Sequence, residues 1–369
     1  MEKRALGTTG LQVSVLGFGG FHLVEIPSAD AARLLGSYLD NGGSYIETAA
    51  GYGEGRSESK IGAGVSHRRA EYVLATKSTE RTKDGFLKSL DNSLRNLKTD
   101  HVDLMFMHAV QTEAEADAIL GPGGAMEGAE AAREAGKLRF VAISGHGRPD
   151  GLLHAMKLHR FDALMTVFNY FDRFNFPTVE NELLPLCTHR GTGLIAMKAF
   201  GDGYLHKSPV PALRYALSMP VATVVAGINS DAMLKSDLEM VARFKPMTDA
   251  EKEEVYRTAP ELGDYVCRLC GKCRTDEFDP QSVFLLEAVF DRQMDDKRVG
   301  DSAHYALRER LRQWFLQAEV ARKEYAALRP RVDPTKDYSR LSTLCPYGID
   351  VDRKLKIAHE KLSADGYIA

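Results

Sequence analysis

The chain has 369 residues, which suits one large barrel or two domains better than one small module. Hydrophobic residues make up 44% and charged residues 27%, which argues against disorder as the dominant state. The formal charge of -3 creates no global field for a polyanion, so we expect no nucleic-acid partner. No apolar run approaches the roughly 18 residues of a membrane-spanning helix, and the N-terminus lacks the apolar core of a signal peptide. We therefore expect a cytoplasmic protein without a membrane partner.

The first 245 residues alternate short β-branched runs with longer helical patterns. The predicted strands are 13–17, 45–47, 72–77, 102–108, 138–144, 163–169, 193–198 and 223–227. The predicted helices are 28–41, 57–65, 84–97, 124–136, 150–159, 177–190, 209–218 and 230–243. Eight strands, each followed by a helix, predict an α/β fold, the (β/α)8 TIM barrel, whose usual size is about 250 residues. A doubly wound open sheet is the alternative, but the Gly-rich turn after the first strand opens no dinucleotide-binding helix.

Polar residues end several of the predicted strands. They are Glu47, Lys77, His108, Ser144, Asn169 and Lys198. In a barrel, all of these side chains lie at the C-terminal mouth, where active sites are built. Polar residues can also end strands without any function. Two lysines, a glutamate and a histidine at the ends of apolar strands nevertheless favour a functional site.

The pattern changes near residue 245, and we predict two domains, 1–245 and 246–369. The second begins with an amphipathic helix whose capping residues are Thr248 and Glu251. Two helical patterns, 281–292 and 302–328, belong to a helical insertion at about 274–344. An apolar stripe on the second pattern indicates packing against a core, with a homo-oligomer contact or an active-site lid as alternatives.

Four of the five cysteines lie in this second domain. They are Cys267, Cys270, Cys273 and Cys345, and Pro346 follows the last of them. Bacterial ferredoxins bind a cluster with the sequence C-x2-C-x2-C-x3-C-P, and here the helical insertion lengthens the gap before the last cysteine. This spacing predicts a [4Fe–4S] cluster. A zinc site with four cysteine ligands is the alternative, although such sites favour paired CxxC units. The fifth cysteine, Cys187, is predicted to be a small buried apolar residue.

The strand-end residues suit the reduction of a carbonyl group, which needs a hydride on carbon and a proton on oxygen. Tyr52 could donate that proton if a nearby ammonium group, that of Lys77, lowers its pKa from about 10. His108 could donate a hydrogen bond to the carbonyl oxygen and stabilise the developing negative charge.

The N-terminal part resembles the aldo-keto reductases over nearly the whole barrel. The similar segments are RALGTTGLQVSVLGFGG, Glu47-Thr48-Ala49 with Tyr52-Gly53 and Ser57-Glu58, LATK ending in Lys77, and HVDLMFMH ending in His108. The resemblance implies that Tyr52 is the acid, that Lys77 and His108 assist it, and that an acid stands at position 47. The family usually has Asp where this chain has Glu47. Either Glu47 reaches Lys77 by a shifted rotamer, or the carboxylate acts differently on the charge and orientation of Lys77.

The resemblance also implies NADP(H) or NAD(H) as a cofactor. Ser144 matches the serine that contacts the nicotinamide amide, and the other candidates are Asn169, Lys198, Gly227 and Asn229. Ser236-Asp237 replaces the Glu-Asn pair of the family, and Met197-Lys198-Ala199 replaces the Met-Lys-Pro of its sulfur-cluster branch. The run CPYGIDVDRKLKIAHEKL resembles the tail of ferredoxin-like domains that follow some aldo-keto reductases, so the expected relatives are the branch with a C-terminal [4Fe–4S] domain.

We therefore expect an aldo-keto-reductase-like oxidoreductase that interconverts a small aldehyde or ketone and its alcohol and carries an additional [4Fe–4S] cluster. One alternative is an iron–sulfur redox protein on this barrel that has weakened or lost nicotinamide use and exchanges electrons with a partner protein. The other is a non-catalytic barrel whose cluster is structural. Nicotinamide binding separates the first function from both alternatives.

Overall fold

The structure is a computed structural model that describes residues 1–146, 148–294 and 317–363. The chain forms two compact units. The first comprises Met1–Phe168, Thr178–Ala199 and Leu213–Pro246, and the second comprises Asn169–Pro177, Phe200–Ala212 and Met247–Ala369. The second unit therefore includes two segments that lie inside the predicted barrel domain of residues 1–245.

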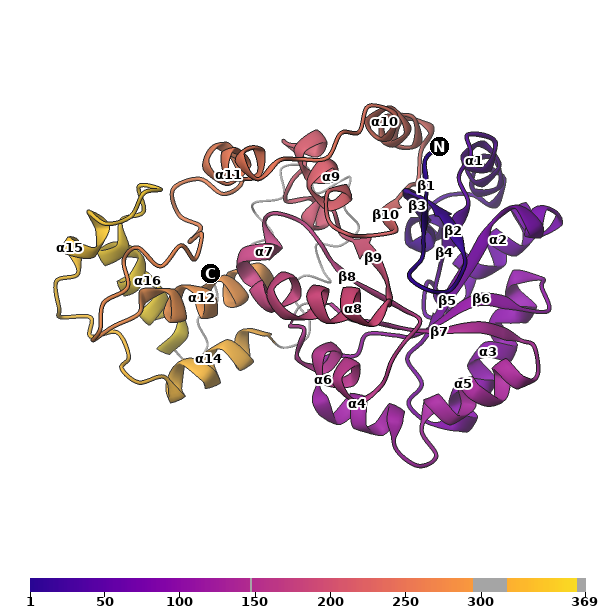
Figure 1. Ribbon diagram of the computed structural model, residues 1–369, viewed down its shortest axis with the longest axis horizontal. Helices are drawn as coiled ribbons and strands as arrows, with labels where there is room; N and C mark the ends of the chain where they lie inside the picture. The colour runs from indigo at the N-terminus through magenta and orange to yellow at the C-terminus, as the bar shows by residue number, and fades with distance from the viewer. Residues whose placement is uncertain (147, 295–316, 364–369) are drawn as a thin grey trace. The chain divides into compact units, whose positions relative to one another are not determined.

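The first unit is built around a closed barrel of eight parallel strands, which confirms the predicted architecture (Figure 1). In barrel order the strands are β10 (Thr223–Gly227), β3 (Leu16–Gly19), β4 (Tyr45–Glu47), β5 (Val73–Ser78), β6 (Val102–Met107), β7 (Leu138–Ser144), β8 (Ala163–Val167) and β9 (Gly193–Met197). The first barrel strand begins later than the predicted strand 13–17, because β2 (Gln12–Ser14) pairs with β1 (Lys3–Ala5) in an antiparallel hairpin.

Helices follow the strands along the chain, and the helices of the first unit surround the barrel (Figure 1). The α-helices are α1 (Ser28–Asp40), α2 (Arg56–Val65), α3 (Lys83–Leu97), α4 (Glu113–Leu120), α5 (Ala125–Glu134), α6 (Asp150–Leu158), α7 (Asp172–Asn175), α8 (Leu184–Arg190), α9 (Pro209–Leu217) and α10 (Asp231–Ala242). Short turns of other helix types are η1 (Gly20–Glu25), η2 (Ser66–Glu71), η3 (Val179–Leu183) and η4 (Gly201–Gly203). Of these elements, α7, η4 and the start of α9 belong to the second unit. The sequence analysis missed α4 and α7, although α4 begins with a capping box of Thr112 and Glu115.

Apolar side chains fill the barrel, as expected for a packed core rather than a pore. Ala75, Leu104 and Phe106 from neighbouring strands are fully buried in this core. Leu6 and Leu11 of the N-terminal hairpin belong to the same cluster. Leu6 lies against Gly193, the first residue of β9, so the hairpin closes the end of the barrel opposite the mouth.

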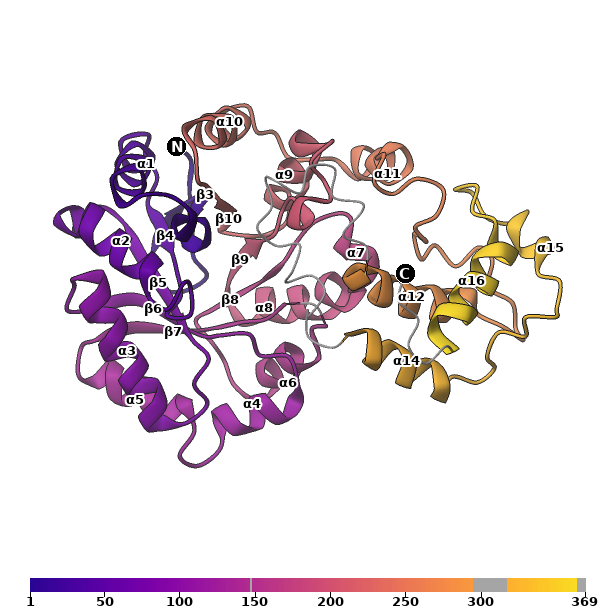
Figure 2. The ribbon, with the colours of Figure 1, turned by 180° about the vertical axis from the view of Figure 1, so that it is seen from behind.

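The second unit is mostly helical in the ranges that the structure describes. Its C-terminal elements are α11 (Asp249–Thr258), α12 (Pro280–Met294), α14 (Gln317–Ala327), α15 (Ser339–Ser342) and α16 (Val351–Ser363). Helices α12, α14 and α16 pack against one another (Figure 2). The predicted capping box of Thr248 and Glu251 is present, and the first part of the predicted helix 302–328 lies outside the described residues. Within the described ranges, none of the helices combines the length and apolar character needed to cross a membrane.

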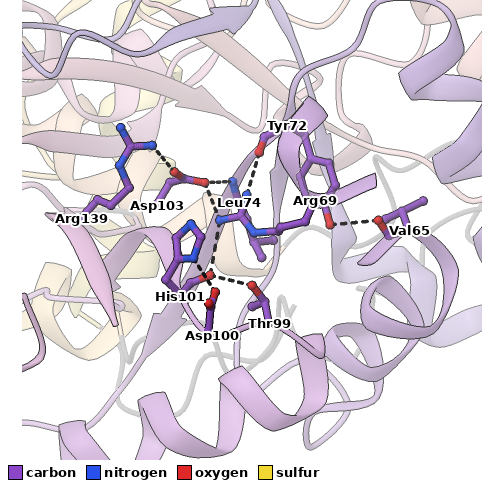
Figure 3. A network of polar contacts seen from close by, with 9 residues as sticks. All are labelled: Val65, Arg69, Tyr72, Leu74, Thr99, Asp100, His101, Asp103 and Arg139. Carbon is purple, nitrogen blue, oxygen red and sulfur yellow. Dashed lines mark hydrogen bonds and ion pairs between the residues drawn. The ribbon is translucent and has the colours of Figure 1, made fainter. Parts of the chain in front are cut away.

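A buried carboxylate ties three barrel strands together at the end opposite the mouth (Figure 3). Asp103 on β6 is 2% exposed. It accepts hydrogen bonds from Arg69 (2.7 Å), Arg139 (2.6 Å) and the amide of Leu74 on β5 (2.9 Å). Burial acts to raise the pKa of Asp103, but Arg69 and the Leu74 amide outweigh it and hold that pKa below its usual value.

We expect Asp103→Asn to lower the free energy of unfolding by about 3 kcal/mol at pH 7, because it leaves two guanidinium groups without their carboxylate. The folded-state pKa is depressed, so the stabilisation is present above about pH 4 and is lost as the pH falls through the folded-state pKa. The difference between parent and variant should therefore shrink in acid. Urea unfolding across pH measures it. Asp40→Asn, which removes an exposed partner of Arg68, is the control and should cost at most about 1 kcal/mol. Equal losses for both variants at pH 7 would contradict the prediction.

Candidate active site and cysteine pocket

Three adjacent strands bring the predicted catalytic residues to one end of the barrel. Glu47 ends β4, Lys77 lies near the end of β5, and His108 directly follows β6. The strands are parallel neighbours, so their C-terminal ends form part of one mouth.

Lys77 is the centre of this site. Its Nζ forms an ion pair with Glu47 and donates hydrogen bonds to the carbonyl oxygen of Thr48 (2.9 Å) and to Oη of Tyr52 (3.0 Å). Lys77 is 2% exposed and Glu47 is 4% exposed. The longer glutamate side chain therefore reaches the lysine from the position where the family usually has aspartate.

The electrostatics of this pair keep the lysine charged. Burial acts to lower the pKa of Lys77, but Glu47 and Tyr52 outweigh it, so its pKa is raised. Burial raises the pKa of Glu47, and Lys77 opposes that change. An ammonium group thus lies at hydrogen-bond distance from the Tyr52 hydroxyl, where it would stabilise a phenolate.

Tyr52 lies in the turn between β4 and α2, and buried polar side chains hold the neighbouring residues in place. Gly55 has φ 85°, a conformation that suits glycine, and it caps the start of α2. The next residue but one, Ser57, donates to the carbonyl oxygen of Gly20 (2.7 Å) and contacts Thr48 (2.8 Å). These bonds anchor both sides of the turn that carries the tyrosine.

Aromatic rings continue across the mouth from Tyr52. The Phe21 ring packs edge-on against the Tyr52 ring at 5.0 Å between centroids, and the centroid of the His108 ring lies 6.1 Å from that of Tyr52. Burial, with the charges of Lys77 and Arg81, lowers the pKa of His108 to about 3. His108 is therefore neutral near pH 7 and can donate a hydrogen bond from one ring nitrogen.

A second histidine at the mouth was missed by the sequence analysis. His146 lies two residues beyond Ser144, the end of β7, and its ring centroid is 6.1 Å from that of His108. Burial, followed by the charge of Lys198, lowers the pKa of His146 well below its usual value. The signal for it was present in the sequence, since it follows a strand end by only two residues.

The cofactor candidates of the first unit have different surroundings. Ser144 is buried, and its Oγ has no hydrogen-bond partner among the residues described. Lys198 follows β9 with φ 59°, an uncommon conformation for a residue other than glycine. At the end of β10, an added Cβ on Gly227 would lie 2.3 Å from the His22 ring, and Asn229 donates to Glu25 (3.0 Å). Segment η1 therefore packs on this strand end.

The remaining cofactor candidate, Asn169, belongs to the second unit. Its side-chain oxygen accepts the amides of Phe171 (3.0 Å) and Asp172 (2.7 Å), and its amide group donates to Asp172 (2.8 Å). These bonds organise the start of α7. Asn169 therefore has a local structural role in addition to any contact with a cofactor.

The four C-terminal cysteines line one pocket of the second unit. Cys267, Cys270, Cys273 and Cys345 share it with Arg268, Phe284 and Tyr347. In the described ranges, no group of three or more Cys, His, Asp or Glu side chains could hold a metal ion. Burial raises the pKa of both Cys267 and Cys273 to about 11. Cys187 is buried in the first unit, as predicted.

A closed parallel barrel with an ionisable cluster at the C-terminal ends of its strands is the architecture of a TIM-barrel enzyme. A model of the aldo/keto reductase family matches residues 15–216, more than half of the chain. The chain belongs to the aldo/keto reductase family and is an aldo-keto-reductase-like oxidoreductase.

Individual relatives agree with this assignment. The chain is 29% identical to the uncharacterized oxidoreductase YqkF of Bacillus subtilis (strain 168), over 57% of this chain and 68% of YqkF. It is 30% identical to L-galactose dehydrogenase of Arabidopsis thaliana, over 57% of this chain and 69% of that enzyme. The holo form of aldo-keto reductase AKR11C1 from Bacillus halodurans superimposes with a TM-score of 0.60 and 25% identity, over 69% of this chain and 95% of that one.

Proposed function

We propose that this protein reduces an aldehyde or ketone with NADPH or NADH, or runs the reverse reaction, and that its second unit holds a [4Fe–4S] cluster. The observation that carries the first part is the ammonium of Lys77, which contacts both the Glu47 carboxylate and the Tyr52 hydroxyl. This arrangement supplies a phenol whose conjugate base is stabilised, which is what a general acid near neutral pH requires.

When bound, the nicotinamide supplies the hydride that adds to the carbonyl carbon. The residues of this chain manage the proton and the charge. Tyr52 donates its Oη proton to the carbonyl oxygen, and Lys77 stabilises the phenolate that remains. Glu47 holds Lys77 charged and oriented, and neutral His108 donates a hydrogen bond to the same oxygen. In the reverse direction, the phenolate of Tyr52 accepts the proton of the alcohol.

The buried Ser144 fits a nicotinamide amide, because its Oγ has no partner among the described residues and an amide offers both a donor and an acceptor. Asn169, Lys198, Gly227 and Asn229 are proposed as further cofactor contacts. The last two lie beside η1, since the His22 ring lies close to Gly227 and Asn229 donates to Glu25.

The cysteine pocket fits a polynuclear cluster better than a single zinc ion. Zinc sites with four cysteine ligands favour paired CxxC units, whereas a bacterial ferredoxin run places three cysteines three residues apart and a fourth before a proline. Cys267, Cys270 and Cys273 follow the ferredoxin spacing, and they line one pocket with Cys345. Cluster binding would require the thiols to be deprotonated. Burial works against this deprotonation, because it raises the pKa of Cys267 and Cys273, so the bound cluster has to stabilise the thiolates.

Replacing any one of Cys267, Cys270, Cys273 and Cys345 with Ala should abolish the broad brown absorbance of the anaerobically purified protein and lower its iron content. Each variant removes one ligand of a four-ligand set. Cys187→Ala is the matched control and should leave both properties intact, since that thiol lies in the first unit. Full iron after Cys345→Ala would show that the distant cysteine is not part of the ligand set.

Steady-state kinetics of the anaerobic protein with NADPH and NADH, against a panel of aldehydes and ketones, tests the proposed reaction. Turnover with either nicotinamide supports it. A protein that holds iron but neither binds nor oxidises a nicotinamide would instead favour an iron–sulfur redox protein that exchanges electrons with a partner protein.

A further inference from the structure

Arg268 is a buried cation beside the cysteine pocket. It is 6% exposed and stands between Cys267 and Leu269 in the loop that carries the first cysteines. Its guanidinium donates to the backbone carbonyl oxygens of Tyr256 (3.0 Å), Leu262, Gly263 and Val266. In the part of the chain that the structure describes, no carboxylate forms an ion pair with it. Backbone carbonyl oxygens therefore satisfy its hydrogen bonds, its guanidinium lies 5.0 Å from the centre of the Tyr347 ring, and a buried cation held in this way is stabilised by an anion close to it.

A second buried cation, Lys354, lies on α16. It is 5% exposed, pairs with Glu287 (2.6 Å), and stands 3.5 Å from the centre of the Tyr265 ring and 5.1 Å from that of Phe284, which lines the pocket. Lys361 also pairs with Glu287 (3.1 Å). A single buried carboxylate, Glu287, is therefore shared by two lysines, and Lys354 and Arg268 place two buried cations next to the cysteine loop.

The loop that carries Cys267 also directs a backbone N–H group at the sulfur atom of that cysteine. Leu269 has φ 52°, which is strained for a residue with a branched side chain. In this conformation its amide donates to Sγ of Cys267 (3.4 Å). Strain of this kind is retained where the surrounding structure requires a specific backbone direction.

We propose that Arg268 and Lys354 are positioning residues that offset the negative charge of a cluster bound by the four cysteines and thereby raise its reduction potential. The inference rests on the cluster of the proposed function. Four thiolates give a [4Fe–4S] cluster a net negative charge, and reduction adds one electron to it. Buried positive charge stabilises the reduced form more than the oxidised form, since net charge and hydrogen bonds to sulfur set the potential of such clusters.

The test is a redox titration of the anaerobically purified full-length protein, followed by electron paramagnetic resonance, with iron content measured for each variant. Arg268→Gln and Lys354→Gln should each shift the midpoint potential to a more negative value. Arg268→Lys keeps the charge and should stay near the parent. Arg257→Gln removes an equal charge from an exposed arginine paired with Glu254 and should leave the potential unchanged.

The outcomes separate this inference from the one on which it rests. A parent protein without iron overturns the cluster and this inference with it. Full iron and equal potentials in the parent, Arg268→Gln and Lys354→Gln overturn only the inference. If Arg268→Gln loses its iron while Arg268→Lys retains it, the charge is needed to hold the cluster, and the potential of Lys354→Gln then decides the effect on reduction.

Discussion

Tyr52→Phe is expected to lower the rate of carbonyl reduction by at least ~100-fold, and by up to ~10,000-fold, because it removes the proposed proton donor. The phenyl ring keeps its packing against Phe21 and His108, so cofactor affinity should stay nearly unchanged. The substitution should therefore lower kcat and leave the dissociation constant of the cofactor nearly unchanged. Nicotinamide fluorescence titration together with steady-state rates measures both quantities on the same preparation.

Phe21→Leu is the matched control for Tyr52→Phe, because it alters the ring contact and leaves the hydroxyl in place. Its rate should remain far above that of Tyr52→Phe. If Tyr52→Phe reduces a substrate of the parent at the parent's rate, another group donates the proton.

Glu47→Gln should lower the rate by about 10- to 100-fold, since it leaves Lys77 without its carboxylate in a buried site. The pKa of Lys77 should then fall, and its hold on the Tyr52 phenolate should weaken. Glu47→Asp keeps the negative charge on a shorter side chain and should retain much more activity. Steady-state kinetics of the parent, Glu47→Gln and Glu47→Asp, with the pH dependence of kcat, shows whether the charge of the carboxylate or its position beside Lys77 sets the rate.

Folding is the control that this second prediction requires, because Lys77 and Glu47 are both buried. Circular dichroism and thermal unfolding should show that Glu47→Gln remains folded at the assay temperature. Equal rates for folded Glu47→Gln and the parent would remove Glu47 from the mechanism. If none of the three proteins turns over with a nicotinamide, the altered residue belongs to a site that no longer transfers hydride.

Most of the barrel could be predicted from the sequence because its strands are short apolar runs with clear ends. β4, β7 and β10 begin and end at the predicted residues. Helix α4 was missed because its alternating acidic and alanine residues give only a weak apolar face. The segment RALGTTGLQVSVLGFGG resembles the first hairpin and strand of the family, and the hairpin of β1 and β2 is present, but the residue pattern alone did not separate β2 from the first barrel strand.

The candidate site was predictable to different degrees. The resemblance placed Glu47, Lys77, Tyr52 and His108 at one mouth, and the structure brings the first three into direct contact. No local pattern indicates that Asp103 joins two arginines, or that Glu287 is shared by two lysines, because the partners come from distant parts of the chain. The packing of His22 on Gly227 is equally invisible in the sequence.

The surroundings of Lys77 also determine whether its amine could react with an aldehyde, the kind of substrate that the proposed function assigns to this site. An ordinary lysine amine adds to aldehydes through its nitrogen lone pair and forms an imine. Lys77 is buried, its raised pKa keeps it protonated, and its three N–H bonds match three acceptors: Glu47, the Thr48 carbonyl oxygen and Tyr52. No lone pair is exposed to an electrophile at the mouth. An amine can therefore lie beside a reactive carbonyl without being consumed by it, and the same contacts that tune the tyrosine keep the lysine chemically inert.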